Sequence, residues 1–424
     1  MFFDRPESGE RAVLVHLNLA SESEREDPRE FEELVLSAGG DPVAYIMGSR
    51  DTPHPRTFVG SGKLDELREE LQLQEAEIVM FNHALSPSQE RNLEEELECR
   101  VIDRTGLILD IFAQRARTHE GKMQVELAYL QHMATRLVRG WTHLERQKGG
   151  IGVRGGPGET QLESDRRLLR ERIKAIKVRL EKVRKQRDQG RRARRRAEIP
   201  TVALVGYTNA GKSTLFNRIT ESKVYVADKL FATLDPTLRR LELENIGPVI
   251  LADTVGFIAH LPHKLVEAFK ATLEETMSAD LLIHVIDAAS TERDSNIYEV
   301  QDVLGEIGAQ DIPQLQVYNK LDLLAQTPRI ERNEDGLPER VWLSAATGDG
   351  CDLLLQAIAE LVGQDMVSET LDLEPDQGGL RAALYDLGAV EKEDYTEDGV
   401  AHLSVRLPRA DWNRLMKKGP EPLF

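Results

Sequence analysis

The stretch G-Y-T-N-A-G-K-S, from Gly206 to Ser213, decides the fold of the central part of the chain. It fits the pattern G-x-x-x-x-G-K-S, follows the apolar run TVALV (201–205) and precedes the helical pattern TLFNRI (214–219). Glycines in this position let backbone N–H groups turn toward phosphate oxygens at the N-terminus of the helix. We therefore predict a phosphate-binding loop in which Lys212 contacts the β- and γ-phosphates and Ser213 binds Mg²⁺.

Three later motifs follow in the order expected of a GTPase. D-T-V-G (Asp253–Gly256) ends the apolar run PVILAD, so Asp253 is expected to hold Mg²⁺ through water and the backbone N–H of Gly256 to sense the γ-phosphate. N-K-L-D (Asn319–Asp322) ends in a carboxylate that accepts hydrogen bonds from guanine N1–H and the 2-amino group, which adenine lacks. S-A-A (Ser344–Ala346) presents a backbone N–H to guanine O6. Together these motifs predict binding of GTP rather than ATP.

The switch segment F-A-T-L-D-P-T (Phe231–Thr237) contains two threonines, Thr233 and Thr237, whose hydroxyl could bind Mg²⁺. We favour Thr233 because it lies in the F-x-T-L pattern of related GTPases, although an ordinary loop threonine is the alternative for each. Catalytic roles are assigned to Lys212, Thr233 and Gly256. The predicted GTP-binding set is Gly206, Tyr207, Thr208, Asn209, Ala210, Gly211, Lys212, Ser213, Thr214, Phe231, Ala232, Thr233, Leu234, Asp235, Asp253, Thr254, Val255, Gly256, Asn319, Lys320, Leu321, Asp322, Ser344, Ala345 and Ala346.

Phe257 follows D-T-V-G, at the position where many GTPases carry a glutamine that orients the attacking water. A phenyl ring cannot do this. Because Lys212, Ser213 and Asp253 are present, we predict low basal hydrolysis that rises when a partner or a cation completes the site.

Composition limits the class of protein. The chain has 424 residues, of which 40% are hydrophobic and 30% charged, enough for several domains with sizeable cores. It has only two cysteines and no run of about 18 apolar residues, so we expect no disulfide framework, no membrane span and a cytoplasmic location. The net charge is -18, yet residues 166–196 contain 16 Lys or Arg against three acidic residues. This segregation concentrates attraction for polyanions on one segment.

The pattern along the chain predicts a multidomain α/β protein. Strands and helices alternate over residues 1–104, which indicates a small N-terminal α/β domain with a largely parallel sheet. An antiparallel helical hairpin is expected over 105–198, with a glycine-rich tip loop at about 139–160. A GTP-binding domain with a mixed sheet flanked by helices follows over 199–364. The remainder, 365–424, is expected to form a small α+β domain.

The prediction of a hairpin depends on two stripes of apolar residues at helical spacing. One includes Met123 and Leu127, on a helix expected to start near Thr105, and the other includes Ile173 and Ile176. The stripe on the second helix is narrow, so most of that helix is expected to remain solvated and basic.

Three further segments make the chain resemble the HflX family of GTPases: RTFVGSGKLDEL (56–67), DRTGLILDIF (103–112) and GGIGVRGGPGETQLE (149–163). The resemblance implies a cytosolic GTPase that binds the large ribosomal subunit and splits stalled or idle ribosomes in stress. It implies ATP binding through the N-terminal region in some members. It also implies that an apolar residue such as Phe257 replaces the glutamine.

Asn209 matches a G-x-x-N-x-G-K-S variant found in potassium-activated GTPases. The resemblance implies that its amide oxygen places K⁺ beside the phosphates, where the ion would neutralise developing charge as an arginine finger does. The alternative is that Asn209 only stabilises the turn of the loop.

The glycine-rich tip and the basic helix are the candidate RNA-binding elements. Glycines let the backbone approach a nucleic-acid surface, and arginines contact phosphates. The predicted residues are Gly149, Gly150, Gly152, Arg154, Gly155, Gly156, Arg191, Arg192, Arg194, Arg195 and Arg196. A loose turn and a solvated coiled-coil face are the alternatives.

Gly60, Gly62 and Lys63 precede a predicted helix and could hold an anion such as ATP at its N-terminus, although an ordinary helix start is favoured. Two rivals to a ribosome-splitting GTPase stay open. One is an RNA chaperone or remodeller modulated by nucleotide, and the other is a signalling GTPase with a protein effector. We expect a monomer.

Overall fold

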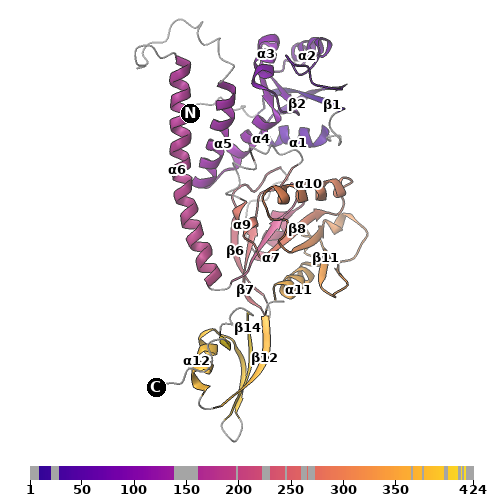
Figure 1. Ribbon diagram of the computed structural model, residues 1–424. Helices are drawn as coiled ribbons and strands as arrows, with labels where there is room; N and C mark the ends of the chain where they lie inside the picture. The colour runs from indigo at the N-terminus through magenta and orange to yellow at the C-terminus, as the bar shows by residue number, and fades with distance from the viewer. Residues whose placement is uncertain are drawn as a thin grey trace.

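In the computed structural model of the chain, the described residues are 9–20, 28–137, 161–196, 199–221, 230–243, 246–258, 265, 273–363, 366–374, 377–395, 400–408, 412 and 415–416. They form a four-stranded, a seven-stranded and a three-stranded sheet, which follow one another from top to bottom in Figure 1. A long helical hairpin runs beside the first two.

The N-terminal sheet contains β1 (Arg11–Leu19), β2 (Asp41–Arg50), β3 (Ile78–Phe81) and β4 (Arg100–Asp103), all parallel, in the order β2-β1-β3-β4. Its helices are α1 (Pro28–Ala38), α2 (Ser61–Leu73), α3 (Pro87–Leu97) and α4 (Arg104–Arg115). The predicted alternation of strand and helix and the parallel sheet are confirmed.

Side chains that alternate along β1 connect the sheet to a helical layer on each face. Leu14 lies in one apolar cluster with Phe31 of α1 and Phe112 of α4. Val15 lies in a second cluster with residues of α2 and α3, such as Leu67. Because successive residues of a strand point to opposite faces, this short sheet is covered on both sides.

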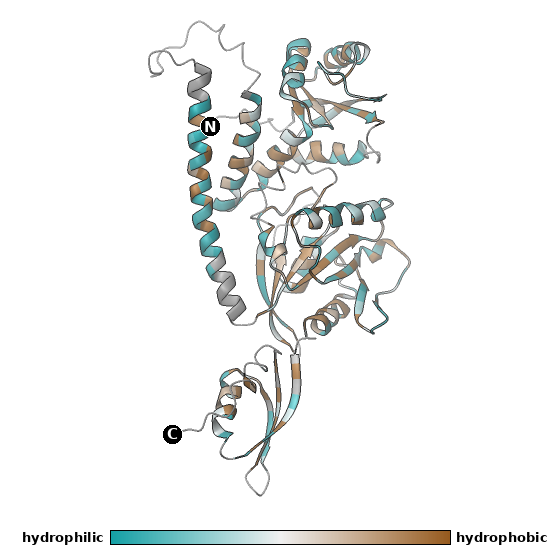
Figure 2. Cartoon of the chain, viewed as in Figure 1, coloured by the Kyte–Doolittle hydropathy of each residue, from teal (hydrophilic) through white to brown (hydrophobic). Residues whose placement is uncertain are grey.

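Helices α5 (His119–Leu137) and α6 (Gln161–Arg196) form the antiparallel hairpin that the apolar stripes predict. Met123 and Leu127 of α5 pack with Ile176 of α6. Figure 2 shows the described part of α6 as mostly hydrophilic, in contrast to the strands of the central sheet.

The prediction that the first hairpin helix starts near Thr105 is wrong. Helix α4 ends at Arg115 and packs against α1, so it belongs with the N-terminal sheet. The backbone leaves the helical region at Ala116 (φ -60°, ψ 112°). The next two amides, of Arg117 and Thr118, donate to the carboxylate of Asp235 instead of continuing the helix.

The central sheet contains β5 (Thr201–Val205), β6 (Thr237–Leu243), β7 (Gly247–Asp253), β8 (Leu281–Asp287), β9 (Gln314–Asn319), β10 (Arg329–Arg332) and β11 (Pro338–Trp342), in the order β10-β11-β9-β8-β5-β7-β6. Its helices include α7 (Lys212–Thr220), α9 (Glu274–Met277), α10 (Arg293–Glu306) and α11 (Cys351–Val362). β6 and β10 are antiparallel to their neighbours and the other pairs are parallel, which confirms the mixed sheet. The carboxyl ends of the parallel strands meet at one edge, where α/β sheets bind ligands.

The C-terminal part contains an antiparallel sheet of β12 (Met366–Leu373), β14 (Ala401–Pro408) and β13 (Val390–Tyr395), with helix α12 (Gly378–Asp386) packed on it. This confirms an α+β unit, in which β14 has the clearest strand pattern in the sequence. The other two strands carry the acidic runs SETLDL and VEKEDY, whose charges hide the strand pattern. Among the residues described here, no helix is long and apolar enough to cross a membrane.

A polar cluster connects the hairpin to the N-terminal unit, and it predicts that the stability of the protein depends on pH. Arg136 of α5 donates through Nε to Glu90 Oε2 at 2.6 Å and through Nη2 to Asp103 Oδ2 at 2.9 Å. Burial raises the pKa of Glu90 from 4.5 to about 7, even though Arg136 opposes the shift.

A carboxyl group whose pKa is raised by folding stabilises the fold below its unfolded pKa and loses that effect as the pH rises through its folded pKa. We therefore expect wild type to lose up to about 3 kcal/mol of unfolding free energy, relative to Glu90→Gln, between pH 5 and pH 8. Urea unfolding at both pH values measures the difference. Parallel pH curves for the two proteins would show that Glu90 stays ionised and paired with Arg136.

Candidate GTP-binding site

The loop between β5 and α7 has the geometry of a phosphate-binding loop. Gly206 has φ +149°, and a Cβ there would lie 2.2 Å from the carbonyl oxygen of Val285. Gly211 has φ +95°, and a Cβ there would lie 2.2 Å from Asn319 Nδ2. Because both positions combine a left-handed backbone with a close approach, each requires glycine.

Three oxygen-bearing side chains converge beside the start of α7. Ser213 Oγ lies 2.7 Å from Thr233 Oγ1 and 2.8 Å from Asp253 Oδ2, and Thr233 Oγ1 lies 3.1 Å from the same carboxylate oxygen. Of the two candidate switch threonines, Thr233 is the one in this cluster, whereas Thr237 begins β6. Hydroxyl and carboxylate oxygens are the ligands that Mg²⁺ prefers.

Asp253 is fully buried, and burial raises the pKa of its carboxyl group. Its second oxygen, Oδ1, has no hydrogen-bond partner among the residues that the structure describes. An ionised carboxylate in such a place is stable only beside a positive charge or a strong donor. A hydrated Mg²⁺ fits both the oxygen set and this buried, unpartnered atom.

Lys212 lies at the other side of the same loop. Its Nζ donates to the carbonyl oxygens of Gly206 at 3.0 Å and Tyr207 at 2.7 Å. Burial lowers the pKa of Lys212 to about 8, and the nearby Asp253 partly offsets this. Phosphate oxygens would supply further negative charge to this buried ammonium.

The base-recognition motifs are joined to the phosphate loop by Asn319. Its Nδ2 donates to the carbonyl oxygen of Ala210 at 2.8 Å, and its Oδ1 accepts from the backbone N–H of Ala345 at 2.9 Å. Asp322 Oδ1 accepts from Ser344 Oγ at 2.5 Å. The N-K-L-D and S-A-A motifs are therefore held against each other at the same edge of the sheet.

Sequence reasoning missed Asp287 and Arg218, two residues that support these loops. Lys320 (φ +65°) pairs through Nζ with Asp287 Oδ2 at 2.7 Å. Arg218 of α7 donates through Nε to the carbonyl oxygen of Ala345 at 3.2 Å. Asp287 ends β8 at the ligand-binding edge, so the rule that functional residues follow parallel strands would have found it. No local signal marks Arg218.

Phe257 takes part in the site through its backbone. Its N–H donates to the carbonyl oxygen of Gly206 at 3.1 Å, and its carbonyl accepts from the N–H of Thr208 at 2.7 Å. The ring is only 1% exposed and belongs to the apolar core. This side chain therefore supplies packing and no polar group to the site.

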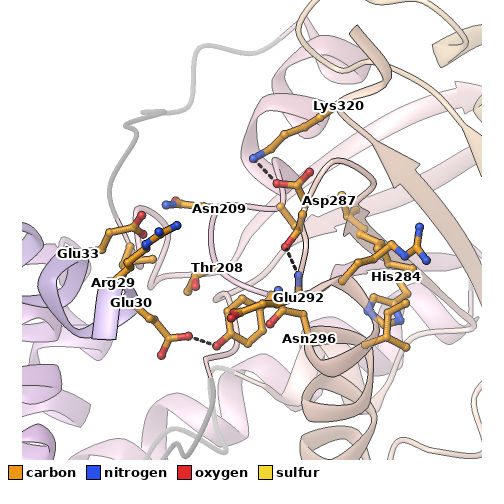
Figure 3. Close-up of a pocket in the computed structure, with 18 residues that line it drawn as sticks. Arg29, Glu30, Glu33, Thr208, Asn209, His284, Asp287, Glu292, Asn296 and Lys320 are labelled. Carbon is orange, nitrogen blue, oxygen red and sulfur yellow. Dashed lines mark hydrogen bonds and ion pairs between the residues drawn. The ribbon is translucent and has the colours of Figure 1, made fainter. Parts of the chain in front are cut away.

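The N-terminal unit reaches the phosphate loop from outside. A cavity of about 340 Å³ lies between α1, the loop residues Tyr207–Ala210 and the start of α10, as Figure 3 shows. Tyr207 donates its hydroxyl hydrogen to Glu30 of α1, and Arg104 Nη2 donates to Glu30 Oε1 at 2.7 Å. The phosphate loop is thus linked to the N-terminal sheet.

The structure brings the four predicted nucleotide motifs to one edge of the sheet, whereas Phe231, Leu234 and Asp235 of the switch segment contact other parts of the molecule. The ring of Phe231 packs edge-on against Phe112 of α4, with centroids 4.7 Å apart. The carboxylate of Asp235 contacts the chain before α5. Of the predicted RNA-binding residues, Gly149, Gly150, Gly152, Arg154, Gly155 and Gly156 lie outside the described residues, as do the side chains of Arg191, Arg192, Arg194, Arg195 and Arg196.

Comparison with known proteins identifies the family. Four family models match in order: "GTP-binding GTPase N-terminal" (25–113), "GTP-binding GTPase Middle Region" (115–194), "50S ribosome-binding GTPase" (201–320) and "HflX C-terminal domain" (330–421). The chain is 62% identical to the GTPase HflX of Escherichia coli K12 over 419 residues, which cover 99% of this chain and 98% of the relative. The chain belongs to the HflX family of GTPases.

A second HflX protein supports this assignment. The GTPase HflX of Magnetococcus marinus is 48% identical over 87% of this chain and 86% of its own. A crystal structure of SsGBP in complex with GDP shares 26% identity over 84% of this chain and 99% of that chain, with a TM-score of 0.47. This HflX chain binds guanine nucleotide and hydrolyses GTP.

Proposed function

We propose that the chain uses GTP binding and hydrolysis to dissociate stalled or idle ribosomes under stress, through contact with the large ribosomal subunit. The observation that carries the proposal is the contact of the nucleotide-binding domain with both helices of the hairpin, through Asp235 at the start of α5 and Glu274 against Arg184 of the basic helix α6. The description "50S ribosome-binding GTPase" of the model that matches residues 201–320 supports the choice of partner.

Within the nucleotide site, we assign Ser213 and Thr233 to Mg²⁺ directly and Asp253 through its water shell. Bound Mg²⁺ would neutralise charge on the β- and γ-phosphates. Lys212 is assigned to the same phosphates, and the backbone N–H of Gly256 to sensing the γ-phosphate. Asp322 is assigned to the guanine edge. The convergence of hydroxyl and carboxylate oxygens at 2.7 to 3.1 Å supports the metal assignment.

The basic helix supports a polyanionic partner. Its arginines include three that pair with acidic residues of other segments: Arg172 with Glu126, Arg184 with Glu274 and Arg187 with Glu120. Exposed cations remain along a groove on another face of α6, lined by Arg170, Lys174, Lys177, Lys182 and Lys185. This face and residues Arg191 to Arg196 are assigned to rRNA phosphates.

Ribosome binding is therefore expected to be strongly salt-dependent. Each phosphate contact releases counterions, so affinity for the large subunit should fall by at least about 100-fold between 50 and 200 mM salt. Replacing Arg191, Arg192, Arg194, Arg195 and Arg196 together by Gln should lower both the affinity and the slope, as measured by co-sedimentation. Affinity that stays flat with salt, or survives these replacements, would contradict the assignment.

A cation requirement tests the assignment of Asn209. This residue is exposed and adopts φ +57°, at the turn of the phosphate loop. If its amide oxygen holds K⁺ beside the phosphates, basal hydrolysis should be about tenfold faster in KCl than in NaCl at equal ionic strength, and Asn209→Ala should remove the difference. Equal rates in the two salts would show that Asn209 only shapes the turn.

ATP binding at the N-terminal region is a secondary proposal. Gly60 caps α2, and Lys63 Nζ pairs with Glu66 Oε2 at 2.6 Å. An ordinary helix start explains these contacts, so an ATP role requires that Lys63 exchange this partner for phosphate. A Lys63→Ala variant with unchanged ATP binding would exclude it.

Sedimentation of purified ribosomes with GTP, GDP and a non-hydrolysable GTP analogue separates the proposal from its rivals. We expect free subunits to appear in a nucleotide-dependent way. Binding to naked RNA regardless of nucleotide would favour an RNA chaperone, and no association with ribosomes or RNA would favour a signalling GTPase.

A further inference from the structure

Asp235 belongs to the switch segment, yet its carboxylate is bound by the start of hairpin helix α5. Its Oδ2 accepts from the backbone N–H of Arg117 at 2.8 Å and of Thr118 at 2.9 Å. Its Oδ1 accepts from the Thr118 hydroxyl at 2.5 Å. Thr118 Oγ1 in turn accepts from the backbone N–H of Gly121 at 2.9 Å. The negative group therefore completes the N-terminal cap of α5, where the helix dipole favours it.

Gly121 makes room for this contact. A Cβ at Gly121 would lie 2.1 Å from Asp235 Oδ1 and 3.0 Å from Asp235 Cγ. Glycine within a helix costs about 1 kcal/mol relative to alanine, so its presence in the first turn of α5 has a steric explanation. Only a residue without a side chain lets the carboxylate lie against this turn.

The other side of the same short segment faces the nucleotide site. Thr233, two residues before Asp235, lies against Ser213 and Asp253. The intervening Leu234 is buried, and Phe231 is fixed against Phe112 of α4. The segment is thus held between the oxygen cluster and the junction of α4 and α5. Figure 1 shows the lower end of α5 beside the central sheet.

We propose that Asp235 is a positioning residue that ties Thr233 to the hairpin, so that the nucleotide state of the site sets the N-terminal cap of α5. The inference rests on the proposed role of Thr233 as a Mg²⁺ ligand. When Mg²⁺ and GTP hold Thr233, Asp235 stays on α5. When hydrolysis releases the switch segment, the backbone N–H groups of Arg117 and Thr118 at the start of α5 lose the Asp235 carboxylate as their acceptor. Helix α5 carries the change toward Leu137, which precedes the glycine-rich segment.

Gly121→Ala is the sharpest test, because it displaces the Asp235 carboxylate while it raises the intrinsic helix propensity of α5. We expect single-turnover GTP hydrolysis to fall about tenfold through misplacement of Thr233, with KM for GTP within about twofold of wild type. The Mg²⁺ concentration needed for half-maximal rate should rise. Hydrogen exchange in the first turn of α5, which should differ between GDP and a non-hydrolysable analogue in wild type, should become the same in both states.

Gly305→Ala in α10 is the matched control, because a Cβ there meets no atom within 4 Å. It makes the same chemical change in a helix and should leave all four readouts unchanged. Thr118→Val removes the hydroxyl from the hairpin side without touching the nucleotide-binding domain. It should shift the same readouts in the same direction, by about threefold in rate. Circular dichroism establishes that each variant is folded.

Thr233→Ala separates failure of this inference from failure of the proposed site. If Thr233→Ala hydrolyses GTP as wild type does, the Mg²⁺ assignment is wrong and the inference falls with it. If Thr233→Ala loses hydrolysis while Gly121→Ala and Thr118→Val keep the wild-type rate and the nucleotide-dependent exchange, the site stands and only the coupling through Asp235 is overturned.

Discussion

Asp322→Asn is expected to exchange GTP for xanthosine triphosphate as the preferred nucleotide. The carboxylate of Asp322 is assigned to guanine N1–H and the 2-amino group, two donors that an amide cannot both satisfy. Xanthine carries an oxygen at position 2, which the new amide N–H₂ can donate to. Affinity for GTP should fall by at least about 100-fold, because a buried donor loses its charged acceptor.

Competition between the two nucleotides for a fluorescent GDP analogue measures the exchange of preference. The Ser344 hydroxyl, which donates to Asp322 Oδ1 at 2.5 Å, can still donate to an amide oxygen, so the loop should keep its shape. Lys320→Ala is a suitable control, since it changes the neighbouring side chain and should weaken both nucleotides alike. If Asp322→Asn binds GTP as wild type does, guanine is recognised elsewhere.

Asp253→Asn is expected to have two opposite effects. GTP hydrolysis should fall by at least about 100-fold, because the Mg²⁺ assigned to this site would lose the anionic acceptor for its water shell and would no longer neutralise charge on the phosphates. In the absence of nucleotide, the folded protein should gain about 1 kcal/mol of stability, because burial raises the pKa of Asp253 and the neutral amide removes a buried charge.

Two measurements test this prediction. One is the rate of GTP hydrolysis at saturating Mg²⁺, and the other is the thermal unfolding temperature without nucleotide. Ser213→Ala is the comparison, because it should reduce hydrolysis while leaving the buried carboxylate in place. Loss of stability in Asp253→Asn would show that its hydrogen bonds to Ser213 and Thr233 outweigh the cost of burial. Retained hydrolysis would contradict the Mg²⁺ assignment.

The nucleotide site was predictable from sequence because each of its motifs follows a strand of one sheet. Parallel strands bring their carboxyl ends to one edge, so Ser213, Asp253 and Asp322 come together whatever lies between them in the chain. The F-x-T-L pattern favoured Thr233 over Thr237, but only the structure shows that the Thr233 hydroxyl approaches Asp253 while Thr237 begins β6.

The contacts between domains could not be read from the sequence. Asp235 and Thr118 are over 100 positions apart, and neither has a neighbour pattern that marks the other. The pairing of Tyr207 with Glu30 joins residues even further apart in the sequence. The break between α4 and α5 follows from the same cause, because amides that would continue the helix are used by a carboxylate from another domain. Local sequence patterns predict helices and strands. Hydrogen bonds between residues far apart in the chain can be found only when the arrangement of those helices and strands is known.

The proposed function requires that nucleotide bound at this site drives dissociation of ribosomes. The altered nucleotide preference of Asp322→Asn tests that claim. Light scattering would follow intact ribosomes mixed with Asp322→Asn and either GTP or xanthosine triphosphate, beside wild type with GTP. We expect subunits to separate with wild type and GTP, and with Asp322→Asn only when xanthosine triphosphate is present. Separation by Asp322→Asn that is equal with either nucleotide or with none, or no separation by wild type with GTP, would contradict the claim.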